Sequence, residues 1–176
     1  MWIWGTGGHA KVVRQSYGLP IDFTVDDANP ELPWKEQYRG YHGIIAIGDN
    51  KARKAVADRL GEAKFRGIAD LFAAVRCDYK FIHYIGNFLG PNAVVGVDTV
   101  LGNHVIINTG ASVDHDCKIG DFVHIAPGAH LCGNVEVGDG AFVGAGTIVT
   151  PGSKIEPWAF IKAGSLVTPN RIVARF

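Results

Sequence analysis

The sequence has no excess of charge of either sign, because its 17 lysines and arginines balance 17 aspartates and glutamates. We therefore do not expect the basic surface that binds nucleic acid or an anionic membrane. No apolar run approaches the roughly 20 residues of a membrane span. The N-terminus also has no basic segment followed by an apolar signal core. These absences predict a protein with no nucleic-acid partner and no membrane insertion.

Cysteine is scarce as well. Only Cys77, Cys117 and Cys132 occur, an odd number without the paired spacing that is typical of metal sites. The sequence therefore predicts neither a disulfide framework nor a cysteine-bound metal, and a reducing cytoplasm is the simplest setting. With 176 residues, the chain can form one medium domain or two small ones and can bury a real core.

Glycine, by contrast, is abundant: 23 residues occur without collagen periodicity, which is a reason to search for repeats. From Leu89 onward, every sixth residue as far as Val167 is Leu, Ile or Val, over fourteen positions. About three residues in ten in this segment are of those types, so chance agreement is on the order of one in millions. The residue four places after each of the first thirteen positions is small or slim, as at Ala93, Cys117 and Ser153.

A six-residue period is typical of a parallel β-helix, and it excludes an amphipathic α-helix. Each short strand turns one aliphatic and one small side chain inward, and glycine permits the corners between strands. Stacked coils then bury columns of aliphatic side chains that no single repeat could bury. The pattern does not set the handedness, and the general rule for crossovers favours a right-handed coil.

Residues 1–75 have a different pattern, in which short apolar runs alternate with helical segments. We expect strands at "MWIW", "DFTV" and "GIIAI", and helices at "KVVRQSYG" and "NKARKAVADRLG". This alternation predicts a small parallel α/β lobe. The segment from about Phe65 to Phe88 joins the two halves. The expected division is therefore an α/β lobe over residues 1–75 and a β-helix over residues 76–176.

A glycine-rich turn follows the first expected strand. Gly5, Gly7 and Ala10 fit the form G-x-G-x-x-G/A, and Asp26 follows at about the distance of a ribose-binding acid. Such a turn can hold a phosphate at a helix start, although a turn that simply needs glycine would give the same pattern. The lobe is too short for a full dinucleotide site. Half a site suits half a dinucleotide, such as a nucleoside diphosphate that carries a sugar.

The stretch "ASVDHDCKIG", residues 111–120, places His115 between Asp114 and Asp116. The repeat register turns all three side chains away from the interior, so His115 is not a core histidine. An adjacent carboxylate orients an imidazole, fixes its tautomer and raises its basicity, as a general base requires. The alternative is a solvated corner, because surface histidines near acids are common. The register also turns His124 and His130 outward.

Two other classes of function remain to be weighed. A β-helix of the carbonic-anhydrase kind holds zinc through three histidines, two of them five residues apart. No two successive histidines in the run His104, His115, His124 and His130 have that spacing, so we expect no metal. A β-helix that is only a scaffold would leave the Asp-His-Asp cluster and the glycine turn unexplained.

Several longer stretches resemble one known family. The segments "GTGGHAK", "VDD", "IAIGDN" and "INTGASVDHDCKIGDFVHIAPGAHLCGNVEVGDGAFVGAGTIV" are similar to the sialic-acid O-acetyltransferase and nucleotide-sugar N-acetyltransferase family of hexapeptide-repeat acyltransferases. The resemblance covers nearly the whole chain. It implies a Rossmann-like nucleotide-sugar-binding lobe followed by a left-handed parallel β-helix. It also implies acetyl-CoA-dependent N-acetylation of a nucleotide-linked amino sugar, with a UDP-4-amino-4,6-dideoxy sugar favoured and sugar O-acetylation as the alternative. A cytoplasmic homotrimer in glycan biosynthesis is implied as well.

The same resemblance implies roles for individual residues. His115 would be the general base, and Asp116 would hydrogen-bond it and tune its pKa. His124 would contact acetyl-CoA, and either His124 or a backbone N–H would stabilise the oxyanion. Ala145 and Ala163 would lie along the thioester arm, and Asn108 would support the site. The residues implied to contact the nucleotide sugar are Gly7, Gly8, His9, Asp26, Asp27 and Gly48.

Two departures from the family pattern stand out. The front lobe is compact, and the ending "LVTPNRIVARF" lacks the "G-x-P-A-K" tail that lies near the coenzyme adenine. The resemblance therefore assigns no residues to the adenine end of the coenzyme site.

Overall fold

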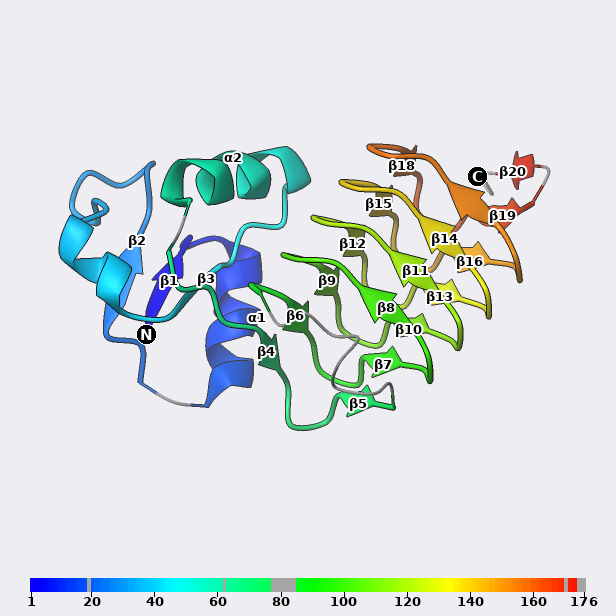
Figure 1. The fold of residues 1–176 in the computed structure, drawn as a ribbon, viewed down its shortest axis with the longest axis horizontal. Helices are drawn as coiled ribbons and strands as arrows, with labels where there is room; N and C mark the ends of the chain where they lie inside the picture. Colours follow the sequence, from blue (N-terminus) through cyan, green and yellow to red (C-terminus); the bar gives the residue numbers. More distant parts are fainter. Residues whose placement is uncertain (19, 62, 77–84, 170, 174–176) are drawn as a thin grey trace.

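The structure is a computed structural model, and it describes residues 1–18, 20–61, 63–76, 85–169 and 171–173. Cys77 and the last three residues of the chain lie outside the described residues. Figure 1 shows a small α/β lobe at the N-terminal end and a long stack of coils that carries the C-terminal half. No helix in the described ranges is long and apolar enough to cross a membrane.

The lobe contains the three strands and two helices that the sequence predicts. Its parallel sheet has the strand order β2-β1-β3. The elements of the lobe are β1 (Trp2–Trp4), α1 (Gly8–Tyr17), β2 (Phe23–Val25), the 3-10 helix η1 (Glu36–Gly40), β3 (Gly43–Ile45) and α2 (Asn50–Leu60).

The period of two along each strand gives the lobe sheet two apolar faces. Trp2, Trp4 and Ile45 turn towards α2, where they form one cluster with buried residues of that helix. Ile3 and Ile44 turn the other way and pack with α1. Because both faces are covered, the strands read as almost continuous apolar runs. Figure 1 shows α1 and α2 on opposite sides of the sheet.

The remaining strands form three parallel sheets, which are the three faces of the β-helix. Sheet 1 contains β4 (Ile68–Ala69), β6 (Phe88–Leu89), β9 (Ile106–Ile107), β12 (His124–Ile125), β15 (Phe142–Val143) and β18 (Phe160–Ile161). Sheet 2 contains β5 (Ala74–Val75), β7 (Val94–Val95), β10 (Ser112–Val113), β13 (His130–Leu131), β16 (Ile148–Val149), β19 (Leu166–Thr168) and the antiparallel β20 (Arg171–Val173). Sheet 3 contains β8 (Val100–Leu101), β11 (Lys118–Ile119), β14 (Glu136–Val137) and β17 (Lys154–Ile155).

The periodic positions form the core of the β-helix, as predicted. Each of the fourteen aliphatic residues from Leu89 to Val167 is at most 4% exposed. The small slots also point inward, and among them only Ala159 is partly rather than fully buried. The coil is a left-handed parallel β-helix, so the general crossover rule gives the wrong hand here and the family resemblance the right one.

Each coil turns three corners, and most corners hold one residue with a left-handed backbone. Several of these residues are not glycine, such as His104, Asp116 and Phe122 with φ of 55°, 58° and 57°. Asn, Asp and His are the non-glycine residues that adopt this conformation most readily, whereas an aromatic residue there is unusual. We name the corners by the sheets they join: Asp116 lies at corner 2–3, and His104 and Phe122 lie at corner 3–1.

The first coil begins earlier than the sequence predicts. β4 pairs with β6 and β5 pairs with β7, so Ile68 to Val75 belong to the β-helix. The expected boundary between residues 75 and 76 therefore lies too late, and the segment from Phe65 to Phe88 is more than a linker. The lobe docks on the outer face of sheet 1, where Ile68, Phe88 and Ile106 pack against the α1 side of the lobe.

Candidate active site

His115 lies on the surface at corner 2–3, as the register predicts. Its Nδ1 is 2.6 Å from Oδ2 of Asp116, and both side chains are about half exposed. Because the carboxylate accepts a hydrogen bond, Nδ1 carries the proton and Nε2 keeps its lone pair. The hydrogen bond to Asp116 raises the pKa of His115 above its ordinary value, with a smaller contribution from Asp114. This arrangement presents a basic nitrogen to solvent.

The imidazole of His115 lies against the next coil, where the matching residue is Gly133. A Cβ at Gly133 would lie only 2.5 Å from Cε1 and Nε2 of His115. The backbone of His115 is held on both sides, since its N–H donates to Asp114 and its carbonyl accepts from Asn134. The absence of a side chain at Gly133 therefore sets the position of the ring.

The glycine turn forms one wall of a cavity of about 640 Å³ in the lobe. All six residues that the resemblance implies for the nucleotide sugar line this cavity: Gly7, Gly8, His9, Asp26, Asp27 and Gly48. α1 begins at Gly8, so its free backbone N–H groups face this region. Thr6 donates a hydrogen bond to Asp26, which lowers the pKa of that carboxyl. The structure thus brings these six residues together in one cavity.

His124 lies on the outer face of sheet 1, as predicted, but the lobe covers it and leaves it 7% exposed. Its Nδ1 is 3.0 Å from the carbonyl oxygen of Gly48, so Nδ1 donates the hydrogen bond. Its Nε2 is 3.1 Å from Nδ2 of Asn108 and accepts from that amide. The N–H of Thr109 donates to Oδ1 of Asn108, which fixes the orientation of the amide. Neutral His124 therefore has no N–H left for an oxyanion, and a backbone N–H becomes the better candidate.

Burial keeps the histidines of this junction neutral. Burial, together with the nearby guanidinium of Arg53, lowers the pKa of His124 to about 4 and that of His9 to about 3. The rings of His9 and His124 lie 6.2 Å apart. Nε2 of His9 has no hydrogen-bond partner in the described part of the chain. The two imidazoles thus act here as neutral polar groups rather than as bases.

A second cleft, of about 540 Å³, opens beside His124, and the sequence analysis missed it. Phe142 and Phe160 stack on its wall with ring centroids 5.0 Å apart, and Phe160 is 71% exposed. Lys51 and Trp158 also line it. Gly48 lines both the cleft and the glycine-turn cavity. The outward aromatic residues one coil apart were the available signal, but outward aromatics alone do not indicate a cavity.

The predicted residues do not form one site within a single chain. Ala145 and Ala163 are exposed and occupy matching places of successive coils at corner 1–2. His115 lies at corner 2–3, on the far side of the β-helix from sheet 1 and the lobe. It lines neither the glycine-turn cavity nor the cleft. Within one chain, the candidate base therefore lies far from the candidate substrate cavities.

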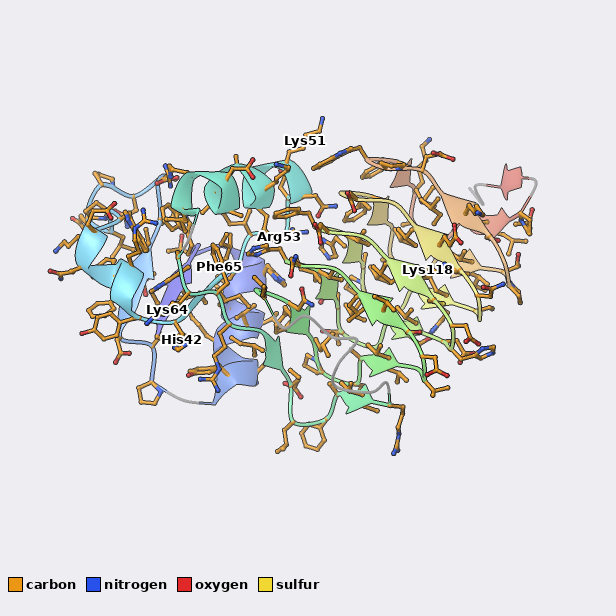
Figure 2. The ribbon with its side chains drawn as sticks, viewed as in Figure 1. His42, Lys51, Arg53, Lys64, Phe65 and Lys118 are labelled. Atoms are coloured by element: carbon orange, nitrogen blue, oxygen red, sulfur yellow. The ribbon has the colours of Figure 1, made fainter. Side chains whose placement is uncertain are left out.

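A groove of about 580 Å³ lies over the outer face of sheet 3. This face carries Lys118, which is labelled in Figure 2, and Glu136, which lies 3.9 Å from Lys118 and 2.8 Å from Lys154, as expected for a solvated surface. Within the described ranges, no three His, Cys, Asp or Glu side chains lie close enough to hold a metal ion.

Comparison with known proteins agrees with this architecture. The family described as Bacterial transferase hexapeptide (six repeats) matches residues 98–133 and 116–151. Among solved structures, PerB from Caulobacter crescentus in complex with CoA and GDP-perosamine is similar, with a TM-score of 0.82 and 30% identity over 94% of this chain and 87% of that one. The chain belongs to the hexapeptide-repeat family of nucleotide-sugar acetyltransferases.

Two other structures extend the likeness. The acetyltransferase domain of PglB from Neisseria gonorrhoeae in complex with acetyl coenzyme A has a TM-score of 0.74 and 25% identity, over 99% of this chain and 98% of that one. WeeI from Acinetobacter baumannii has a TM-score of 0.67 and 21% identity over 98% of each chain, and this likeness concerns the fold. A comparison with curated protein sequences finds no match.

Proposed function

We propose that the protein transfers the acetyl group of acetyl-CoA to the amino group of a sugar linked to a nucleoside diphosphate. The similarity to PerB with CoA and GDP-perosamine, and to the PglB domain with acetyl coenzyme A, supports this reaction class. The sequence resemblance favours a UDP-linked sugar, whereas the PerB structure is a complex with a GDP-linked sugar. Both nucleotides therefore belong in the assay.

The hydrogen bond between His115 and Asp116 is the observation that carries the mechanism. The neutral amine of the sugar attacks the thioester carbonyl, so that a C–N bond forms and the C–S bond breaks. Nε2 of His115 takes the proton that the amine loses, and this proton then neutralises the CoA thiolate. No covalent enzyme intermediate is needed, because a positioned amine can attack directly. A backbone N–H stabilises the developing oxyanion.

The site is shared between copies of the chain in this proposal. His115 and the glycine-turn cavity lie on opposite sides of the β-helix, so the sugar held by one lobe reaches the His115 of a neighbouring copy. A closed ring of three copies satisfies this geometry through one repeated heterologous contact. His124, Ala145 and Ala163 then border the path of the acetyl-CoA arm along the same groove. We propose a homotrimer on this basis.

The decisive experiment combines substrates and variants. Purified protein is incubated with acetyl-CoA and a panel of UDP-, GDP-, dTDP- and CMP-linked amino sugars, and free thiol is followed over time. His115→Ala should lower kcat about 100- to 10,000-fold with the fold intact. Mass spectrometry of the product distinguishes amide from ester. Near-wild-type turnover by the alanine variant would eliminate His115 as the base, and stoichiometric zinc in active protein would favour the metal alternative.

A further inference from the structure

One arginine is completely buried where the lobe meets the β-helix. Arg53 of α2 is 0% exposed, and Figure 2 shows its side chain directed from α2 into the junction. Its hydrogen bonds run to neutral oxygens: Nε donates to the carbonyl of His104 at 3.0 Å, and Nη2 to that of Phe122 at 2.7 Å. Nη1 donates to Ile47 at 2.9 Å and to Gly48 at 3.3 Å. Burial lowers the pKa of Arg53 to about 9, so it remains charged at neutral pH.

Asn50, one turn earlier on α2, extends the same contact. Its Oδ1 accepts from Nη2 of Arg53 at 2.8 Å. Its Nδ2 donates to the carbonyls of Gly140 and Ala141 at 3.0 and 3.1 Å. The amide therefore has both of its ends engaged, one in the lobe and one in the β-helix.

These acceptors are regularly spaced along the β-helix. His104, Phe122 and Gly140 occupy corner 3–1 of three successive coils, each with a left-handed backbone. A buried carbonyl needs a donor, and Arg53 and Asn50 supply one to each of these three. A fork of N–H groups fixes both distance and orientation, unlike an apolar contact. The lobe is thus set in register with three particular coils.

The same guanidinium reaches the residue that connects the two cavities. Gly48 lines both the glycine-turn cavity and the aromatic cleft, and its carbonyl accepts from Arg53 and from Nδ1 of His124. Displacement of Gly48 would remove one of the two hydrogen bonds that set the tautomer of His124, the other being the bond from Asn108. Arg53 therefore acts on His124 through the carbonyl of Gly48.

We propose that Arg53 and Asn50 are positioning residues, which hold the nucleotide-binding lobe at a fixed distance and angle from the β-helix, and that Arg53 also holds the carbonyl of Gly48 against Nδ1 of His124. The expected effect on kcat rests on the proposed function, whereas the positioning of the lobe does not. A nucleotide held in a displaced lobe still binds, but its sugar no longer meets the acetyl donor in the reactive geometry. An error of about 1 Å in such a placement costs about 100-fold in rate.

The test separates binding from placement. In Arg53→Met and Asn50→Ala, kcat with the nucleotide-linked sugar should fall about 10- to 100-fold. The Kd for UDP or GDP alone should stay within about threefold of wild type, because the glycine turn is untouched. Arg53→Lys should recover part of kcat, since it restores the charge without the fork. Lys64→Met, which removes an exposed cation of the lobe outside α2, is the control and should keep wild-type kcat.

A second measurement does not require turnover. The ¹⁵N resonances of His124 should show protonated Nδ1 and unprotonated Nε2 in the wild type, and the Nδ1 resonance should shift in Arg53→Met because its hydrogen bond to Gly48 is weakened. If the wild type acetylates no nucleotide-linked amino sugar, the proposed function fails, but the NMR comparison still tests whether Arg53 positions Gly48 and His124. Unchanged kcat and an unchanged His124 signature in both variants would overturn the inference. Equal losses in kcat and nucleotide binding would also overturn it, because they would indicate a structural role alone.

Discussion

Acidification provides a test of the junction between the lobe and the β-helix, where His9, His104 and His124 are buried. Burial lowers the pKa of His9 to about 3 and those of His104 and His124 to about 4, from an ordinary value of 6.5. Between pH 6.5 and about 4, the unfolded chain therefore binds more protons than the folded one. Because the folded pKa values are depressed, the free energy of unfolding falls as the pH falls through this window.

The size of the effect follows from the linkage relation. Between pH 7 and pH 5, each buried histidine contributes a loss of about 2 kcal/mol, and the three together roughly 5–6 kcal/mol. A whole domain is stable by only about 5–15 kcal/mol, so this loss would bring the protein close to unfolding. His115 acts in the opposite sense, because Asp116 raises its pKa, but its ring is exposed and its contribution is correspondingly small.

His104→Phe isolates one third of the effect. His104 stacks on Phe122, which has the same left-handed backbone at the matching place of the next coil, so a phenyl ring is compatible with this corner. Urea unfolding at pH 7, 6 and 5, followed by tryptophan fluorescence at one protein concentration, should show about 2 kcal/mol less loss in the variant. His42→Gln changes an exposed lobe histidine and should behave as wild type (Figure 2). Equal pH dependence in His104→Phe and wild type would refute the reasoning.

Two further predictions concern the base. Asp116→Asn should move the acid limb of kcat/KM to lower pH, because the interaction that raises the pKa of His115 is lost, and should also lower the plateau; a pH–rate profile measures both. Gly133→Ala should lower kcat about 10- to 100-fold by displacing the His115 ring with little change in Tm. Gly40→Ala, where a Cβ has no neighbour within 4 Å, is its control, and an unaffected kcat in Gly133→Ala would contradict the ring placement.

The interior of the β-helix was predictable because its order is local. A strict period assigns every sixth side chain to the core without knowledge of any distant contact. The sequence analysis missed the first coil because it relied on this period. The inward residue Val75 of that coil lies fourteen positions before Leu89, which is not a multiple of six, so the series does not extend to it. Ala69, which pairs with Leu89, is exposed in this first coil and is not one of the aliphatic types of the series. An insertion between coils thus hides the start of the repeat.

The outward face of the site was only partly predictable. The register correctly turned both His115 and His124 away from the core, but it could not show that the lobe covers His124. That burial depends on contacts between α2 and coils that lie 51 to 91 residues further along the chain. The sequence analysis did not identify Arg53 as a buried residue for a related reason. Arginine is almost never fully buried, so an arginine in a helix rich in Lys and Arg is expected to lie in solvent.

The opposite placement of His115 and the lobe cavity leads to a prediction about assembly. A chain with His115→Ala keeps an intact lobe, and a chain with Gly8→Trp keeps an intact base. Gly8 lines the cavity and a Cβ there meets nothing within 4 Å, so we expect Gly8→Trp to obstruct the cavity with little effect on the fold. A homotrimer of either variant alone should be inactive, because all of its copies lack the same half of the site.

Unfolding and refolding the two variants together at equal concentration should restore activity. A shared site is intact when an intact His115 meets an intact neighbouring lobe, which occurs in about one quarter of the sites in randomly mixed trimers. The mixture should therefore recover about a quarter of the wild-type rate. If each site were built within one chain, no mixed trimer would contain a complete site. Continued inactivity in verified mixed trimers would then exclude a base and a lobe supplied by different copies.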